Sequence, residues 1–196
     1  MPHIAIDINN VRITTTNLAS MRLMNVSVRG ALDQDMKAAV DAMGGSDEEG
    51  SCGHLTWLMD HPLQPGDILR VHLHQDDAKG DAGKTFEQLF PDETPSTRTD
   101  FSISDTIATE LRARPRHHAA FEVQASTSAG QQAAATSDER NTDFSFSVLW
   151  DHFQPNQARI HLATHCLDHV LARMAGTPHL QTTIQAGESA TLSLMA

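Results

Sequence analysis

Short stretches in which apolar and polar residues alternate recur along this chain, and they predict β-strands with one buried face. The clearest stretch is residues 143–150, where the apolar Phe144, Phe146, Val148 and Trp150 alternate with smaller residues. Similar patterns predict further strands over residues 3–8, 11–13, 21–29, 54–59, 68–74, 118–124 and 159–162. Most of the ordered chain is therefore expected to form β-sheet.

Turn-forming residues separate several of these strands, and they predict hairpins. Asn9-Asn10 suits a tight type I′ turn, since asparagine tolerates the left-handed conformation. The segment Pro65-Gly66-Asp67 lies between two predicted strands of the stretch 54–74, around which we expect the chain to be organised. A third turn at residues 186–188 predicts a last hairpin at the end of the sequence. Consecutive strands are thus expected to pair with each other.

Four segments have helical periodicity instead. Residues 32–43 place apolar side chains at i, i+4, i+7 and i+8, and shorter helices are predicted at 85–89, 105–113 and 165–175. Residues 125–141 hold almost no large apolar side chain and are predicted to form a loop. The expected fold class is α+β, a mostly antiparallel sheet with three or four short helices.

The polar, proline-containing segment 91–99 is the best candidate for a connection between two parts of the chain. It would divide a β-rich half at 1–92, with one inserted helix, from an α+β half at 98–196, although a single domain fits the length of 196 residues equally well. Short matches, such as Thr-Asp-Phe-Ser at 99–102 and 142–145, suggest two related halves. Convergent turn chemistry is the alternative explanation.

The composition of the chain argues against several classes of function. The net charge of −11 argues against a nucleic-acid-binding surface, which requires a basic stripe. No apolar run has the length of a membrane span, and the N-terminus does not resemble a signal peptide. The two cysteines do not make a disulfide framework. We therefore expect a cytoplasmic protein that binds neither nucleic acid nor membrane.

An acidic protein of this size fits a non-enzymatic binding role, of the kind filled by bacterial immunity proteins, inhibitors or secretion adaptors. The expected partner is a basic protein, and no cofactor is required. Its contacts would be the acidic loop residues Asp47, Glu48 and Glu49 together with Asp76 and Asp77. Charge at these positions would chiefly increase the rate of association. An alternative without enzymatic chemistry is homo-oligomeric assembly through an exposed sheet edge.

Twelve histidines point to a different alternative, a metal-binding protein or metal-dependent hydrolase. His165 and His169 have i, i+4 spacing on the predicted helix 165–175 and could bind a divalent metal together with His161. The segment His72-Leu73-His74 resembles the HxH element of cupins, in which such a strand pair binds metal. The glutamate that follows in cupins is absent, because residues 76–79 are Asp, Asp, Ala and Lys.

Overall fold

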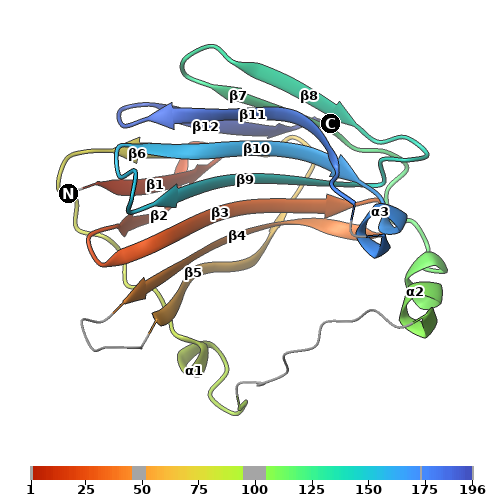
Figure 1. Cartoon of the computed structure of the whole chain (residues 1–196), viewed down its shortest axis with the longest axis horizontal. Helices are drawn as coiled ribbons and strands as arrows, with labels where there is room; N and C mark the ends of the chain where they lie inside the picture. Colours follow the sequence, from red (N-terminus) through yellow and green to blue (C-terminus); the bar gives the residue numbers. More distant parts are fainter. Residues whose placement is uncertain (1, 46–51, 95–104, 173, 196) are drawn as a thin grey trace.

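The computed structural model describes residues 2–45, 52–94, 105–172 and 174–195. Two antiparallel sheets of six strands pack face to face (Figure 1). The strand order is β2-β1-β6-β12-β7-β8 in the first sheet, called sheet A here, and β11-β10-β9-β3-β4-β5 in the second, called sheet B. The protein is thus nearly all-β, so the predicted antiparallel sheet is confirmed, with a smaller helical part than an α+β fold implies.

The strands of sheet A are short. They are β1 (His3–Ile8), β2 (Val11–Asn17), β6 (Ile68–His74), β7 (Glu122–Thr127), β8 (Gln132–Thr136) and β12 (Ser189–Leu194). Sheet B has longer strands, namely β3 (Met21–Ala31), β4 (Gln34–Gly45), β5 (Cys52–Leu63), β9 (Asp143–Asp151), β10 (Gln157–His165) and β11 (Thr177–Gln185). The predicted hairpin at Asn9-Asn10 is confirmed, because both residues have positive φ and β1 pairs with β2.

One hydrophobic core fills the space between the sheets. Alternate residues of each strand point inward, as along β9, where Phe144, Phe146, Val148 and Trp150 are all buried. The opposite sheet contributes inward side chains such as Ile6 and Leu192 to the same cluster. Burial of this kind contributes about 25 cal/mol per Å² of apolar surface and is the main stabilising term.

Strands from both halves of the sequence meet in the middle of each sheet. In sheet A, β6 pairs with β12, and in sheet B, β3 pairs with β9. Each strand of the first half corresponds to the strand numbered six higher in the second half. In both sheets, the corresponding strands lie at equal distances from the middle of the sheet. The strands β1–β6 and β7–β12 therefore have equivalent places about an approximate two-fold axis. A common origin of the two halves stays a prediction, as does a domain boundary at 91–99, where residues 95–99 lie outside the described part.

Two of the predicted hairpins are wrong, although their strands are present. The turn at Pro65-Gly66-Asp67 joins β5 in sheet B to β6 in sheet A, and the turn at 186–188 joins β11 to β12 in the same way. Gly66 and Gly187 adopt φ values of 96° and 92°, so the local turn chemistry is as expected. The chain nevertheless crosses from one sheet to the other, and β6 and β12 then pair with each other in the middle of sheet A.

The helix predicted at 32–43 is wrong, because these residues form a tight turn followed by β4. The structure buries Met36, Ala38, Val40 and Ala42, a period of two, and leaves Met43 43% exposed. The alanine-rich sequence fits the helical period and the strand period equally well. Pairing with β3 and β5 stabilises the strand. The predicted loop at 125–141 is wrong for the same reason, since its small residues complete β7 and form β8.

Three short helices accompany the sheets in the described part of the chain: α1 (Phe86–Leu89), α2 (Asp105–Arg112) and α3 (Leu167–Leu171). The first two agree with the predictions at 85–89 and 105–113. The third is shorter than the predicted 165–175, because β10 continues to His165 in register with β9. This short helix does not bury its apolar side chains, since Val170 is 50% exposed. No helix in the described ranges is long and apolar enough to cross a membrane.

The segment that follows β6, residues 75–84, runs across the edges of both sheets. Asn17 donates from Nδ2 to the carbonyl of Ala78 at 3.2 Å. The backbone amide of Asp81 donates to the carbonyl of Thr15 on β2 at 2.7 Å. Its last residue, Lys84, forms an isolated antiparallel bridge with Thr56 of β5. These contacts hold the 75–84 connection, including its start near the end of β6, against the body of the protein.

Candidate metal centre

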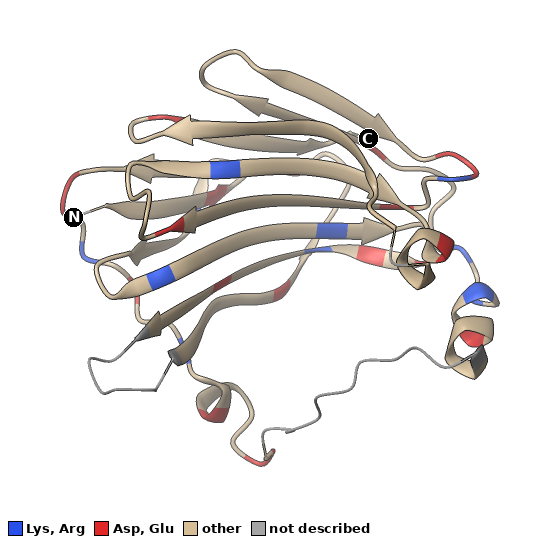
Figure 2. Cartoon of the chain, viewed as in Figure 1, with Lys and Arg blue, Asp and Glu red and all other residues tan. Residues whose placement is uncertain are grey.

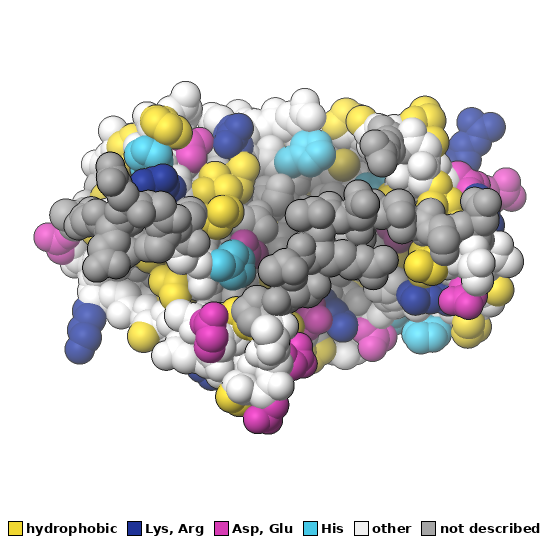
Figure 3. Space-filling model, turned by 60° about the horizontal axis from the view of Figure 1, so that its bottom comes forward, with side chains coloured by type: hydrophobic (Ala, Val, Ile, Leu, Met, Phe, Trp, Pro, Cys, Tyr) yellow, Lys and Arg dark blue, Asp and Glu magenta, His cyan; other side chains and the backbone are white. Residues whose placement is uncertain are grey.

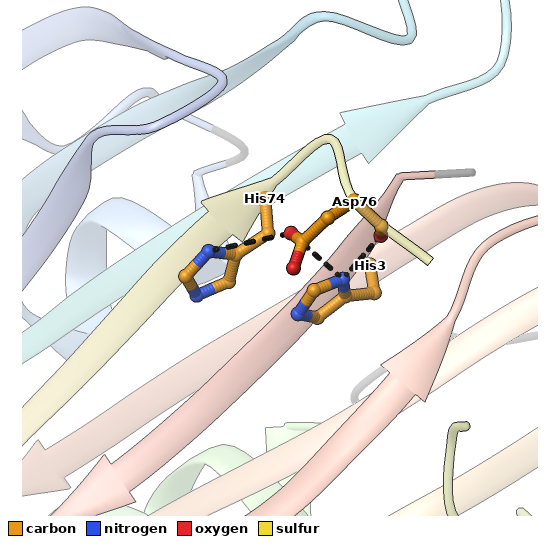
Figure 4. Close-up of side chains that lie close together, drawn as sticks. All are labelled: His3, His74 and Asp76. Carbon is orange, nitrogen blue, oxygen red and sulfur yellow. Dashed lines mark hydrogen bonds and ion pairs between the residues drawn. The ribbon is translucent and has the colours of Figure 1, made fainter. Parts of the chain in front are cut away.

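Three side chains converge where β1 begins and β6 ends (Figure 4). His3 and His74 lie opposite each other in the register of these strands, and Asp76 follows two residues after His74. One potential ligand atom from each of the three lies within 4.8 Å of the others, which makes this the one such group of histidine, cysteine or acidic residues found in the described ranges. Two imidazoles and a carboxylate are a ligand set for a divalent transition metal.

The distances are close to those required for coordination. Asp76 Oδ1 lies 3.8 Å from Nδ1 of His3 and 4.0 Å from Nδ1 of His74. Ligand atoms in a tetrahedral zinc site with bonds of about 2.0–2.1 Å are separated by roughly 3.3 Å. A movement of about half an ångström would bring Asp76 Oδ1 to this separation from both nitrogens, and the side chain of Asp76, which is 77% exposed, has room for it. The stacked rings of His3 and His74 would also have to turn, because the lone pair of each nitrogen lies in the plane of its own ring.

The sheet holds the two histidines differently from the carboxylate. The ring of His3 is almost completely buried, with 5% of the residue exposed, and its Nδ1 donates to the backbone carbonyl of Asp76 at 2.9 Å. The rings of His3 and His74 stack with centroids 4.5 Å apart. Two ligands are thus held by paired strands, while the third comes from a loop tied to the first by a hydrogen bond.

A third histidine, His72, continues the row along β6. Its ring lies 5.7 Å from that of His74, and its Nε2 is 3.4 Å from Oδ2 of Asp7. Asp7 also accepts from the guanidinium of Arg12. Asp7 therefore already contacts both Arg12 and His72, and we do not count it among the candidate metal ligands.

Burial lowers the pKa of two histidines in this row, His72 and His74. Burial lowers the pKa of His74, and the adjacent His3 lowers it further, against the opposing effect of Asp76. Burial likewise lowers the pKa of His72, while Asp7 raises it. A lowered pKa favours the neutral form of His72 and His74, which has the lone pair that binds a metal.

The predicted metal ligands lie elsewhere in the fold. His161 and His165 are on β10 and His169 is on α3, and they are not brought within ligand distance as a group. His165 shares a polar cavity of about 380 Å³ with its register partner Asp143, while His161 lines a different cavity of about 470 Å³. The three are near enough that His169 and His161 both lower the pKa of His165, after the larger effect of burial. Metal binding by these three residues stays a prediction.

The predicted partner contacts are separated in the same way. Asp47, Glu48 and Glu49 lie outside the described residues, and Asp76 faces the histidines. On the face drawn in Figure 3, acidic side chains are scattered among basic and hydrophobic ones and do not gather in one patch. Binding of a basic protein through these residues and Asp77 stays a prediction.

Sequence reasoning found part of the site. The spacing of His72 and His74 points to this strand, whereas the sequence predicts Asp76 as a partner contact and not as a metal ligand. His3 carried no signal, because its partner Asp76 is 73 residues away in the chain.

No model of a known protein family matches the chain, and no curated protein or solved structure matches it either.

Proposed function

We propose that this protein binds a divalent transition metal ion through His3, His74 and Asp76. The observation that carries the proposal is the convergence of three ligand atoms within 4.8 Å from separate parts of the chain. Neutral imidazole suits zinc, nickel, copper and iron, and a single carboxylate does not make the oxygen-rich shell that calcium or magnesium requires. Zinc is the first ion to test.

The proposed centre is an open one. Three protein ligands leave at least one coordination position for water or an exogenous group. The side chains of His74 and Asp76 are 36% and 77% exposed, so that position faces solvent. The buried His3 would anchor the ion, and the more exposed pair would complete the site. Because Nδ1 of His3 donates its proton to the Asp76 carbonyl, a metal ion at this nitrogen requires the other tautomer, with the ring proton on Nε2 and that hydrogen bond broken.

The test is metal content and affinity measured on untagged protein. Elemental mass spectrometry and calorimetric titration with zinc are expected to show about one ion per chain. His74→Ala and Asp76→Asn should each weaken binding at least about tenfold, because each removes one of three ligands. His165→Ala is the matched control, since it removes a half-buried histidine at a strand end far along the other sheet.

Saturable binding that is lost in His74→Ala and kept in His165→Ala supports the proposed site. Binding lost only in His165→Ala would overturn it and transfer the function to the histidines of β10 and α3. Wild-type protein that neither contains nor takes up zinc, nickel or copper would exclude the function altogether.

A further inference from the structure

The two sheets have four edge strands, and three of them are protected. An edge strand presents unpaired N–H and C=O groups and will accept another strand unless something prevents it. β2 is protected by Asp81, whose carboxylate accepts from the backbone of Thr15 at 2.8 Å and from the hydroxyl of Thr14 at 2.9 Å. β5 is protected by Lys84, which exchanges two backbone hydrogen bonds with Thr56. β8 has only five residues.

The fourth edge, β11, is long, and in the described ranges no strand pairs along its outer side. It has nine residues and pairs with β10 alone. Among the described residues, its outer side receives one hydrogen bond, from the backbone of Gln185 at the end of the strand to the carboxylate of Glu188. In the two-fold arrangement of strands, β11 occupies the place equivalent to β5. No described residue bridges to β11 in the way that Lys84 bridges to β5.

The backbone groups available for pairing can be identified. The amide of Ala186, one residue after β11, donates to Asn156 at the start of β10. Because alternate residues of a strand direct their backbone groups to opposite sides, the amides of Gln181 and Thr183 point away from β10. The side chains of both residues are exposed on the outer face of the sheet.

Charge indicates which strand fits this edge. The sequence of β11, TPHLQTTIQ, contains no lysine, arginine, aspartate or glutamate, and Figure 2 shows the strand without charge along its length. Neither a basic nor an acidic peptide would find a counter-charge here. A second copy of this chain, with its net charge of −11, is repelled over most of the surface and least along an uncharged strand.

We propose that the protein forms a two-fold symmetric homodimer in which β11 pairs antiparallel with β11 of a second copy. An antiparallel pair of identical strands is self-complementary, as a closed dimer requires. Its threonine and glutamine side chains form favourable cross-strand pairs. The two copies of sheet B then make one continuous sheet. This inference is independent of the metal centre, which lies on sheet A.

The solution mass tests the dimer. Sedimentation or light scattering at about 100 µM, well above a micromolar dissociation constant, should give twice the chain mass of 21.4 kDa. Thr183→Pro removes an outward-pointing amide that β10 does not use, and proline is tolerated at such edge positions. It should return the protein to the monomer mass, with an unchanged circular dichroism spectrum. Thr183→Val keeps the amide and the branched side chain and should remain dimeric.

A wild-type protein that is monomeric at this concentration overturns the proposal. So does a dimer that persists in Thr183→Pro, because the contact would then lie elsewhere. If Thr183→Pro unfolds, Thr183→Lys replaces it, since two lysines brought together across the two-fold axis would repel without altering the backbone.

Discussion

His3 and His74 lie directly opposite each other on β1 and β6, and their imidazole rings stack with a centroid distance of 4.5 Å and an interplanar angle of 14°. Two rings in this arrangement cannot both carry a proton without direct repulsion. A metal ion held by both rings would require them to turn out of this stack, because each lone pair lies in the plane of its own ring. The stacked pair thus has one consequence for metal binding and another for the pH dependence of stability.

Metal binding should stabilise the fold. An ion that binds only the folded state stabilises it by RT ln(1 + [L]/Kd), or about 2.7 kcal/mol at a hundredfold excess over Kd. For a chain of this size each kcal/mol corresponds to about 2–4 °C, so zinc should raise the melting temperature by about 5–10 °C. The shift is measured by calorimetry with and without chelator. It should vanish in Asp76→Asn and persist in His165→Ala, and an equal shift in both variants would place the ion elsewhere.

Mild acid should destabilise the protein. The pKa values of His72, His74 and His165 are lowered in the folded state, in each case chiefly by burial. The unfolded chain therefore binds more protons than the folded one once the pH falls below the unfolded value of about 6.5. The contribution of these neutral rings to the free energy of unfolding is fully present above that pH. It is lost as the pH falls through the pKa values of the folded state. Urea denaturation at a series of pH values measures this slope.

His74→Gln removes a titrating ring and should make the stability less dependent on pH between about 6.5 and the lower folded values. His117→Gln is the comparison variant, because it replaces an exposed histidine that lies outside this buried row. An identical slope in wild type and His74→Gln would show that this histidine is not held neutral by the fold.

The two halves of the chain should unfold together. Leu69 on β6 and Leu192 on β12 are register partners at the seam between the halves, and both are buried. Replacing either with alanine should cost about 2–5 kcal/mol and shift a single transition of the whole protein. Calorimetry checks this, with agreement between calorimetric and van't Hoff enthalpies as the criterion. Two separate transitions, of which each variant moves only one, would contradict the shared core.

Gly30 should be intolerant of any side chain. A Cβ at this position would lie 2.5 Å from Cε1 of Phe144, the buried residue opposite it on β9. Gly30→Ala should therefore destabilise the protein by about 1–3 kcal/mol, the usual cost of overpacking. Gly53→Ala on β5 is the matched control, because its nearest neighbour would be 3.7 Å away. Chemical denaturation of the two variants compares them directly, and similar stabilities would contradict the close packing at β9.

The local sequence determined where strands and turns occur. Alternation predicted β9 because Phe144, Phe146, Val148 and Trp150 each need burial on one side, and this requirement is visible within nine residues. Asn9-Asn10 predicted its hairpin because two residues with positive φ suit few other structures. Segments with small side chains, such as 32–43 and 125–141, fitted more than one period, so the sequence alone did not decide them.

Tertiary structure decided which sheet each strand joins and which side chains meet. The turns after β5 and β11 have hairpin chemistry, but the same glycine conformations also allow a strand to cross to the opposite sheet. The choice depends on burying both inward faces in one core, which no local pattern records. The group of His3, His74 and Asp76 has the same origin. The sequence determined that histidines lie on strands, and only the pairing of β1 with β6 brought residues from distant parts of the chain within reach of one ion.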